Sequence, residues 1–250
     1  VNLTIGVMGS AAAPVEPSIA LLAKALGAAI AKRGCCMITG ACPGLPLAAA
    51  AGAKEHGGLV VGISPALSRD EHLFKYESPT LHHDVLVYTG SGLMGREVVN
   101  IRSSDIVIIV GGSSGTLGEF AIAYDEGKLI GVLEGTGGIT AIIPTIVATC
   151  QKKTGARVVY HSDPETLVSE LIHVYNTSHY RRPSCFCHAC ETSSAETDSA
   201  ARDVVCGMWI DPSRAIAKRT LDSRTFYFCS ESCASRFDSS ASTYAERVES

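Results

Sequence analysis

The sequence lacks any long apolar run and any strong excess of charge. None of its apolar stretches approaches the roughly 20 residues that cross a bilayer, and its first residues lack the pattern of a secretion signal. Lys and Arg number 21 against 25 Asp and Glu, a net charge of −4, and no stretch clusters the basic residues that nucleic-acid binding requires. We therefore expect a cytoplasmic protein without a membrane or nucleic-acid partner.

Aromatic residues are also scarce, at 6% of the 250 residues, whereas small and aliphatic residues are abundant. This composition is typical of helices packed closely on a parallel sheet whose strands are buried on both faces. Short β-branched runs alternate with longer alanine- and leucine-rich runs over residues 3–175. The alternation predicts an α/β fold, a Rossmann-like doubly wound parallel sheet, with ligands at the carboxyl ends of the strands.

A glycine-rich stretch at residues 111–119 follows the apolar run Ile106–Val110 and opens a predicted helix. Backbone N–H groups at such a helix start approach a phosphate closely, and the helix dipole favours the negative charge. Glu119 lies one turn into the helix, where its carboxylate could face the sugar of a bound nucleotide. The spacing of Thr116 and Glu119 also fits an ordinary capping box, so this stretch alone leaves ligand binding and helix capping open.

The segment from Arg96 to Glu119 resembles the LOG (Lonely Guy) phosphoribohydrolases. Their signature is an arginine helix followed by Pro-Gly-Gly-x-Gly-Thr-x-x-Glu, and Arg96 and Glu119 occur here at the family's spacing. With residues 5–10, 40–46 and 57–65, the resemblance covers roughly residues 1–176. It implies that Arg96 and Glu119 are catalytic and that the protein is a homodimer. The implied phosphate- and nucleotide-binding residues are Ser10, Gly40, Gly44, Gly111, Gly112, Ser113, Ser114, Gly115 and Thr116.

The resemblance implies hydrolysis of the N-glycosidic bond of a nucleoside 5′-monophosphate to free base and ribose 5-phosphate, without a cofactor. Glu119 would stabilise the developing oxocarbenium ion or orient water, and Arg96 would neutralise the phosphate or assist the departing base. Three positions depart from the family: Gly111 replaces the proline, Ser113 replaces the second motif glycine, and Glu97 replaces a lysine. A non-catalytic nucleotide sensor is therefore the alternative.

Composition changes near Tyr180, where a cysteine cluster and a polar stretch typical of a linker follow the aliphatic part. Beyond it, the chain resembles a YHS domain of the TRASH-type group, with its Cys-Gly-Met opening and Phe-Cys-Ser-x-x-Cys close. A unit of about 40 residues buries too little apolar area to be stable unaided, so a structural metal is expected. The predicted domains are residues 1–178 (nucleotide-binding), 179–202 (cysteine cluster and linker) and 203–246 (YHS, treble-clef-like).

Cys206, Cys229 and Cys233 are the predicted metal ligands. Cys229 and Cys233 lie one helical turn apart, and thiolates favour zinc or copper(I). The alternative is a set of buried cysteines that act as small hydrophobic residues. A fourth position is left to water, an acidic side chain, or one of Cys185, Cys187, His188 and Cys190. These last four residues are also candidates for a second metal site.

Overall fold

The computed structural model describes residues 2–11, 15–179, 201–206, 209–210, 212, 215–221, 224–241 and 244. The chain divides into two compact units, Val1–Phe186 and Cys187–Ser250, each of which is described by itself. The candidate ligands Cys185, Cys187, His188 and Cys190 and nearly all of the predicted linker lie outside the described residues. None of the described helices is long and apolar enough to cross a membrane.

The first unit contains a seven-stranded sheet in which every pairing is parallel. Its strands are β1 (Thr4–Gly9), β2 (Cys36–Thr39), β3 (Val60–Ser64), β4 (Val85–Tyr88), β5 (Ile106–Val110), β6 (Leu129–Leu133) and β7 (Arg157–His161). Their order is β4-β3-β2-β1-β5-β6-β7. β1 and β5 are neighbours, with Val7 paired to Ile108, although three strands and four helices separate them in sequence. The predicted Rossmann-like parallel sheet is confirmed.

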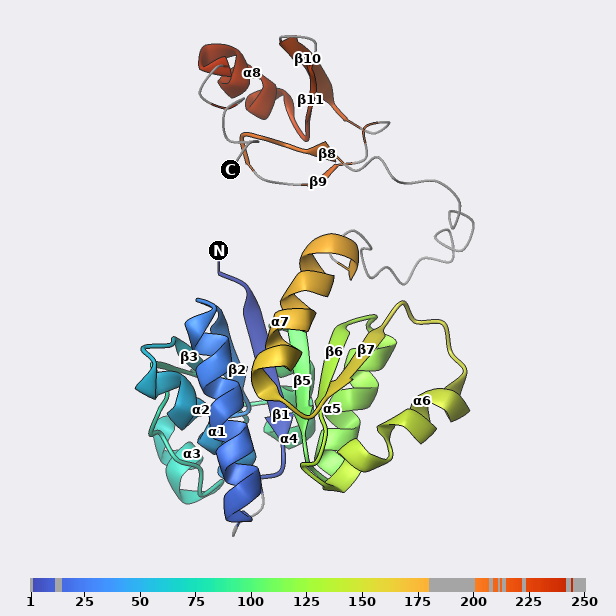
Figure 1. Ribbon diagram of the computed structural model, residues 1–250. Coiled ribbons are helices and arrows are strands. Elements are labelled where there is room, and N and C mark those ends of the chain that lie inside the picture. Colours follow the sequence, from blue (N-terminus) through green and yellow to red (C-terminus); the bar gives the residue numbers. More distant parts are fainter. Residues whose placement is uncertain are drawn as a thin grey trace. The chain divides into compact units, whose positions relative to one another are not determined.

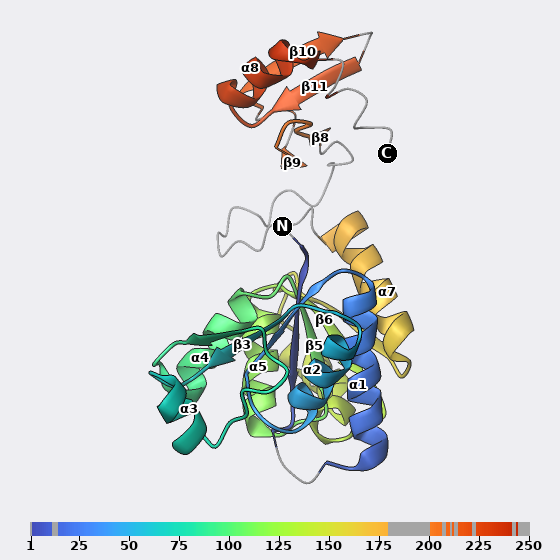
Figure 2. The ribbon, with the colours of Figure 1, turned by 90° about the vertical axis from the view of Figure 1, so that its left-hand side faces the viewer.

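Helices cover both faces of this sheet (Figures 1 and 2). One face carries α1 (Pro17–Lys32), α2 (Leu45–Glu55) and α7 (Pro164–Val174). The opposite face carries α4 (Gly92–Arg102), α5 (Ser114–Asp125) and α6 (Ile143–Cys150). The remaining helical segments are α3 (Arg69–Phe74) and the short turns η1 (Gly138–Ala141) and η2 (Tyr175–His179). Because strand side chains alternate between the two faces, two separate apolar cores form.

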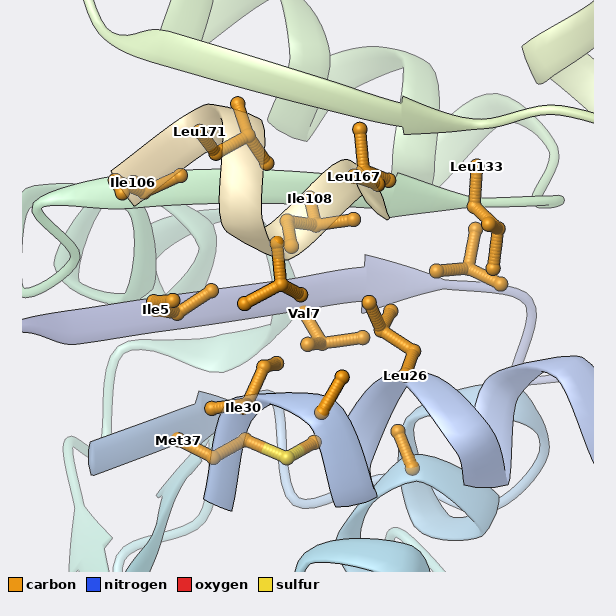
Figure 3. Packing of buried hydrophobic residues seen from close by; sticks show 14 of the residues in the cluster. Ile5, Val7, Leu26, Ile30, Met37, Ile106, Ile108, Leu133, Leu167 and Leu171 are labelled. Atoms are coloured by element: carbon orange, nitrogen blue, oxygen red, sulfur yellow. The ribbon is translucent and has the colours of Figure 1, made fainter. Parts of the chain in front are cut away.

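The larger core lies between the sheet and helices α1, α2 and α7. Ile5 and Val7 of β1 pack there with Leu26 and Ile30 of α1 (Figure 3). The helices α1 and α2 touch through their backbones, since a Cβ atom on Gly27 would lie 1.8 Å from the carbonyl oxygen of Ala49. The small residues that the composition indicated are therefore needed where helices cross at close range.

The strand order reverses between β1 and β5. The chain leaves β1 toward β2 on one side, and β5 continues toward β6 on the other. In open parallel sheets, loops that diverge at such a point leave a crevice at the carboxyl ends of the strands. The loops after β1, β2 and β5 carry most of the candidate site residues.

The second unit is a small α/β module. It contains β8 (Ala201–Arg202) paired with β9 (Trp209–Ile210), and a hairpin of β10 (Ala217–Leu221) and β11 (Arg224–Phe228) followed by α8 (Glu231–Ser239). Phe226, Phe228 and Phe237 form its core, with ring centroids 4.9 and 5.1 Å from that of Phe237. Ser230 caps α8, because its hydroxyl accepts the backbone N–H of Cys233 at 3.2 Å.

Candidate functional site

A pocket of about 230 Å³ opens at the carboxyl ends of β1, β2 and β5. Seven residues singled out from the sequence line it: Ser10, Gly40, Arg96, Ser113, Gly115, Thr116 and Glu119. Four others, Gly44, Gly111, Gly112 and Ser114, do not contribute to its lining. Gly44 instead supports the loop after β1, since the next backbone N–H, that of Leu45, donates to the carbonyl of Ser10 at 2.9 Å. The pocket walls also include Cys42, Leu93 and Glu97.

Arg96 reaches the pocket from α4, and only 7% of its surface is exposed. Its guanidinium lies against the loop after β2, where a Cβ atom on Gly40 would be 1.6 Å from Nη1. Nε of Arg96 is buried and has no hydrogen-bond partner within the described part of the chain. Burial raises the pKa of the neighbouring Cys42 thiol to about 11, although the Arg96 charge opposes the rise. Arg96 is thus a buried cation with an unused donor beside the pocket.

Glu119 faces the same pocket from α5 and is 7% exposed. Burial raises the pKa of its carboxyl to about 7. The Arg96 guanidinium opposes this rise in pKa, the Glu97 carboxylate adds to it, and a hydrogen bond with Asn100 lowers the pKa again. Near neutral pH, Glu119 therefore exists in both protonation states and is able to donate or accept a proton.

Glu97 is the pocket residue that departs most from the expected charge. The residue is 9% exposed, and its carboxylate packs against the glycines of α5, since Oε2 lies 3.0 Å from the position of a Cβ on Gly118. Burial raises the pKa of Glu97, and the Arg96 charge opposes this effect. The charge of Arg96 therefore acts on two carboxyl groups of the pocket, and the sequence indicated the second of them only as a departure from the family pattern.

The glycine turn enters α5 through two residues of positive φ, Gly111 at 58° and Gly112 at 96°. Ser113 is the N-cap, without a side-chain capping bond, so the capping-box interpretation of Thr116 and Glu119 is wrong. Glu119 lies too far along the helix and faces the pocket instead. The first backbone N–H groups of α5 have no acceptor within the helix, and Ser113, Gly115 and Thr116 line the pocket there. This arrangement suits an anionic ligand.

A family profile described as the SLOG cluster4 family matches residues 2–168. The chain belongs to the SLOG cluster4 family. The predicted membership of a LOG-like Rossmann nucleotide-binding family is thereby confirmed. The profile covers the SLOG part alone, and the YHS resemblance of the second unit stays a prediction.

Three relatives illustrate the range of proteins that resemble this SLOG chain. An uncharacterized protein from Archaeoglobus fulgidus is 36% identical over 132 residues, 53% of this chain and 80% of the relative. The cytokinin riboside 5′-monophosphate phosphoribohydrolase of Mycobacterium marinum is 33% identical over 120 residues, 48% of this chain and 61% of the relative. The solved structure of the molybdenum cofactor binding protein from Rippkaea orientalis is 30% identical, with a TM-score of 0.59, and covers 71% of this chain and 99% of that protein.

The sequence did not predict the role of the loop after β6, which packs against the SLOG glycine turn and is hydrogen-bonded to it. The backbone N–H of Gly111 donates to Oγ1 of Thr136 at 2.9 Å, and the N–H of Ile139 donates to the carbonyl of Gly112 at 3.0 Å. The signal in the sequence is the run Gly135-Thr136-Gly137-Gly138 directly after a buried strand. That run predicts a tight turn but not the partner against which it packs.

The second unit brings the three predicted thiols together. Sγ of Cys229 lies 3.5 Å from Sγ of Cys206 and 3.8 Å from Sγ of Cys233. Sulfurs bound to one tetrahedral zinc ion at about 2.3 Å are about 3.8 Å apart, so these spacings fit a metal site. A carboxylate oxygen of Asp203 completes a group whose ligand atoms all lie within 4.8 Å of one another. This cluster could hold a metal ion.

Asp203 is the acidic residue that the sequence left unnamed among the possible fourth ligands. It is fully buried, and its carboxylate accepts the backbone N–H groups of Val205, Cys206 and Cys229 at 2.9, 3.3 and 2.9 Å. These bonds join the loop that carries Cys206 to the segment that carries Cys229. Asp203 therefore fixes the spacing of the thiols whether or not it also contacts a metal.

Proposed function

We propose that the pocket binds a nucleoside 5′-monophosphate and hydrolyses its N-glycosidic bond to free base and ribose 5-phosphate. The observation that carries this proposal is the meeting of Glu119, Arg96 and the start of α5 in one pocket. Glu119 titrates near neutral pH and Arg96 is a buried cation, so the pair provides both charges that cleavage of such a bond requires. The likeness to the Mycobacterium marinum phosphoribohydrolase supports a nucleotide-processing role at the level of the family.

In this mechanism the N–H groups at the start of α5 hold the 5′-phosphate and fix the sugar over Glu119. As the bond between C1′ and the base nitrogen breaks, positive charge develops on the sugar and the electron pair passes to the base. The Glu119 carboxylate stabilises the oxocarbenium ion or orients the attacking water. Arg96 neutralises the phosphate or the departing base. Water then supplies the hydroxyl on C1′ and the proton that the base takes up.

The test is incubation of the purified protein with AMP and a panel of other nucleoside monophosphates, followed by chromatography of the products. We expect free base and ribose 5-phosphate from at least one nucleotide. Glu119→Gln and Arg96→Ala should each lower the rate by about 10²-fold or more, as for removal of a general acid–base or a charge-stabilising group. Glu170→Gln, which changes an exposed carboxylate of α7, is the matched control and should not alter the rate.

A second candidate function is binding of a phosphorylated ligand without cleavage. It is favoured by the likeness to the Rippkaea orientalis protein, nearly all of which this chain covers. Glu97 and Gly111, which depart from the hydrolase motif, also favour it. Such a protein would act as a carrier or sensor of a nucleotide-like compound, the molybdenum cofactor included. Nucleotide binding without release of any base would replace the hydrolase by this function.

For the second unit we propose a YHS-type module, residues 203–246, that holds zinc or copper(I) through Cys206, Cys229 and Cys233. The metal would stabilise a fold whose core contains few large side chains. Reduced thiols in this number are consistent with a cytoplasmic location.

We further propose that the protein is a homodimer. Several large apolar side chains between residues 67 and 94 are exposed, and Phe74 and Met94 are each 80% exposed. Exposed apolar side chains gathered in one region are typical of an interaction surface. Phe74 belongs to α3, Val85 and Val87 belong to β4 at the edge of the sheet, and Met94 lies at the start of α4, which also carries Arg96. A second copy of the chain would cover them and stabilise the helix that positions the guanidinium.

A further inference from the structure

The hydroxyl of Thr136 lies directly behind the glycine turn. Thr136 belongs to the loop between β6 and η1 and is 4% exposed. Its Oγ1 donates to the carbonyl of Leu133 at 2.6 Å and accepts the N–H of Gly111 at 2.9 Å. Because the hydroxyl proton is donated to the carbonyl of Leu133, the hydroxyl oxygen acts as the acceptor for the N–H of Gly111.

A second contact fixes the other side of the turn. The carbonyl of Gly112 accepts the N–H of Ile139 at 3.0 Å. The two loops approach so closely that a Cβ on Gly138 would lie 2.2 Å from the carbonyl oxygen of Gly112. The loop after β6 therefore holds both the donor of Gly111 and the acceptor of Gly112.

These two hydrogen bonds matter because a helix that begins after two consecutive glycines has a very flexible backbone at its start. Glycine loses more conformational freedom on folding than any other residue, and both φ angles here are positive. Proline, the residue of the hydrolase motif at position 111, fixes φ near −65° and has no N–H to donate. Gly111 has a φ of 58° and donates its N–H, so this turn is held by hydrogen bonds and not by the fixed backbone of a proline.

We propose that Thr136 is a positioning residue for the anion site. Its hydroxyl holds Gly111 in the conformation from which the first N–H groups of α5 converge on the phosphate of a ligand. The role rests on the proposed phosphate site but not on cleavage of the ligand. Thr136 itself does not line the pocket, so it acts through the backbone of the turn and not by contact with the ligand.

The experiment compares Thr136→Val, which keeps the shape and removes the hydroxyl, with Thr136→Ser, which keeps the hydroxyl. Dissociation constants are measured calorimetrically for AMP and for adenosine, which differ by the phosphate alone, and every protein compared carries Glu119→Gln so that AMP is not cleaved during the titration. We expect Thr136→Val to weaken AMP binding about tenfold, or about 1.4 kcal/mol, without changing the affinity for adenosine. Thr136→Ser should bind AMP within about twofold of the wild type. Ser78→Ala, which removes a buried hydroxyl that is bonded to the carbonyl of Tyr76 and does not line the pocket, is the matched control and should not change AMP binding.

Hydrogen exchange of the Gly111 amide is the second measurement, because it needs no ligand. The amide should exchange faster in Thr136→Val than in the wild type and in Thr136→Ser. Unchanged AMP affinity in Thr136→Val, or equal exchange in all three proteins, would overturn the role of Thr136. Absence of any binding of phosphorylated probes to the wild type would instead reject the proposed phosphate site, while the exchange data still decide whether the hydroxyl fixes the turn.

Discussion

A Cβ atom on Gly40 would lie 1.6 Å from Nη1 of Arg96, so the guanidinium occupies the space that any other residue at position 40 would fill. Gly40→Ala should therefore expel Arg96 from the pocket and lower base release about as much as Arg96→Ala does. The double variant provides the control. Because both changes remove the same interaction, Gly40→Ala should have little further effect in the Arg96→Ala background. Additive losses in the double variant would show that Gly40 acts independently of Arg96.

The raised pKa of Glu119 predicts a specific dependence of stability on pH. A carboxyl whose pKa is about 7 in the folded protein and 4.5 otherwise binds its proton more tightly when folded. The contribution of this carboxyl group to the free energy of unfolding is therefore largest below pH 4.5. It decreases as the pH rises and is up to about 3 kcal/mol smaller at pH 7 to 8. Glu119→Gln should remove this loss, so its stability relative to the wild type should increase between pH 5 and 8. Urea unfolding of both proteins at several pH values measures the difference, and parallel curves would contradict the prediction.

Glu97 contributes to the pKa of Glu119 through the repulsion of two carboxylates. Arg96, Glu97 and Asn100 of α4 and Cys42 after β2 are the polar groups near the site that bear on this titration. Glu97→Gln removes the repulsion and keeps the size of the side chain, so the pKa of Glu119 should fall. Carbon-13 NMR of labelled glutamate carboxyl groups would follow this titration directly. An unchanged Glu119 titration in Glu97→Gln would show that Glu97 does not contribute to the pKa of Glu119.

Removal of metal should affect the two units differently. We expect a thermal transition of the second unit to shift downward in the presence of a chelator, because the thiol cluster holds its loops together. The transition of the first unit, which has large apolar cores of its own, should stay in place. Differential scanning calorimetry with and without chelator measures both. Cys229→Ser should mimic the chelator, and Cys150→Ser, which changes an exposed thiol of α6, should not.

The proposed homodimer predicts that a charge on the exposed apolar surface separates the subunits. Phe74→Glu should convert the dimer to a monomer, because burying a carboxylate without a partner in an apolar interface is costly. Leu21→Glu, on α1 and similarly exposed, is the matched control and should remain dimeric. Sedimentation velocity of the three proteins provides the measurement. A monomeric wild type would reject the proposal outright.

Much of the first unit could be predicted from the sequence, because its signals are local. The run Ile106–Val110 is buried along its whole length, as a strand covered on both faces must be, and the glycines after it end that strand. The approach of Ser10, Gly40 and Gly115 to one pocket also followed, since carboxyl ends of parallel strands meet at one edge, whereas Thr89 and Gly90, expected there for the same reason, do not line it. Arg96 was located through the family motif.

Contacts between distant segments could not be predicted. The hydrogen bond from Gly111 to Thr136 joins residues 25 positions apart, and it depends on how the loops after β5 and β6 pack together. The need for glycine at position 40 follows from a guanidinium that reaches it from α4. Likewise, nothing near Asp203 in the sequence reveals that its carboxylate accepts N–H groups from two separate segments.

The bond between Gly111 and Thr136 also limits how this protein can be redesigned. Restoring the proline of the hydrolase motif at position 111 would remove the N–H donor and impose a φ that the present turn does not adopt. Thr136 would then keep a buried oxygen with one partner fewer. The glycine turn after β5 and the loop after β6 must therefore be exchanged together. A graft that transfers the glycine turn alone into another parallel sheet would lack the Thr136 hydroxyl that holds it.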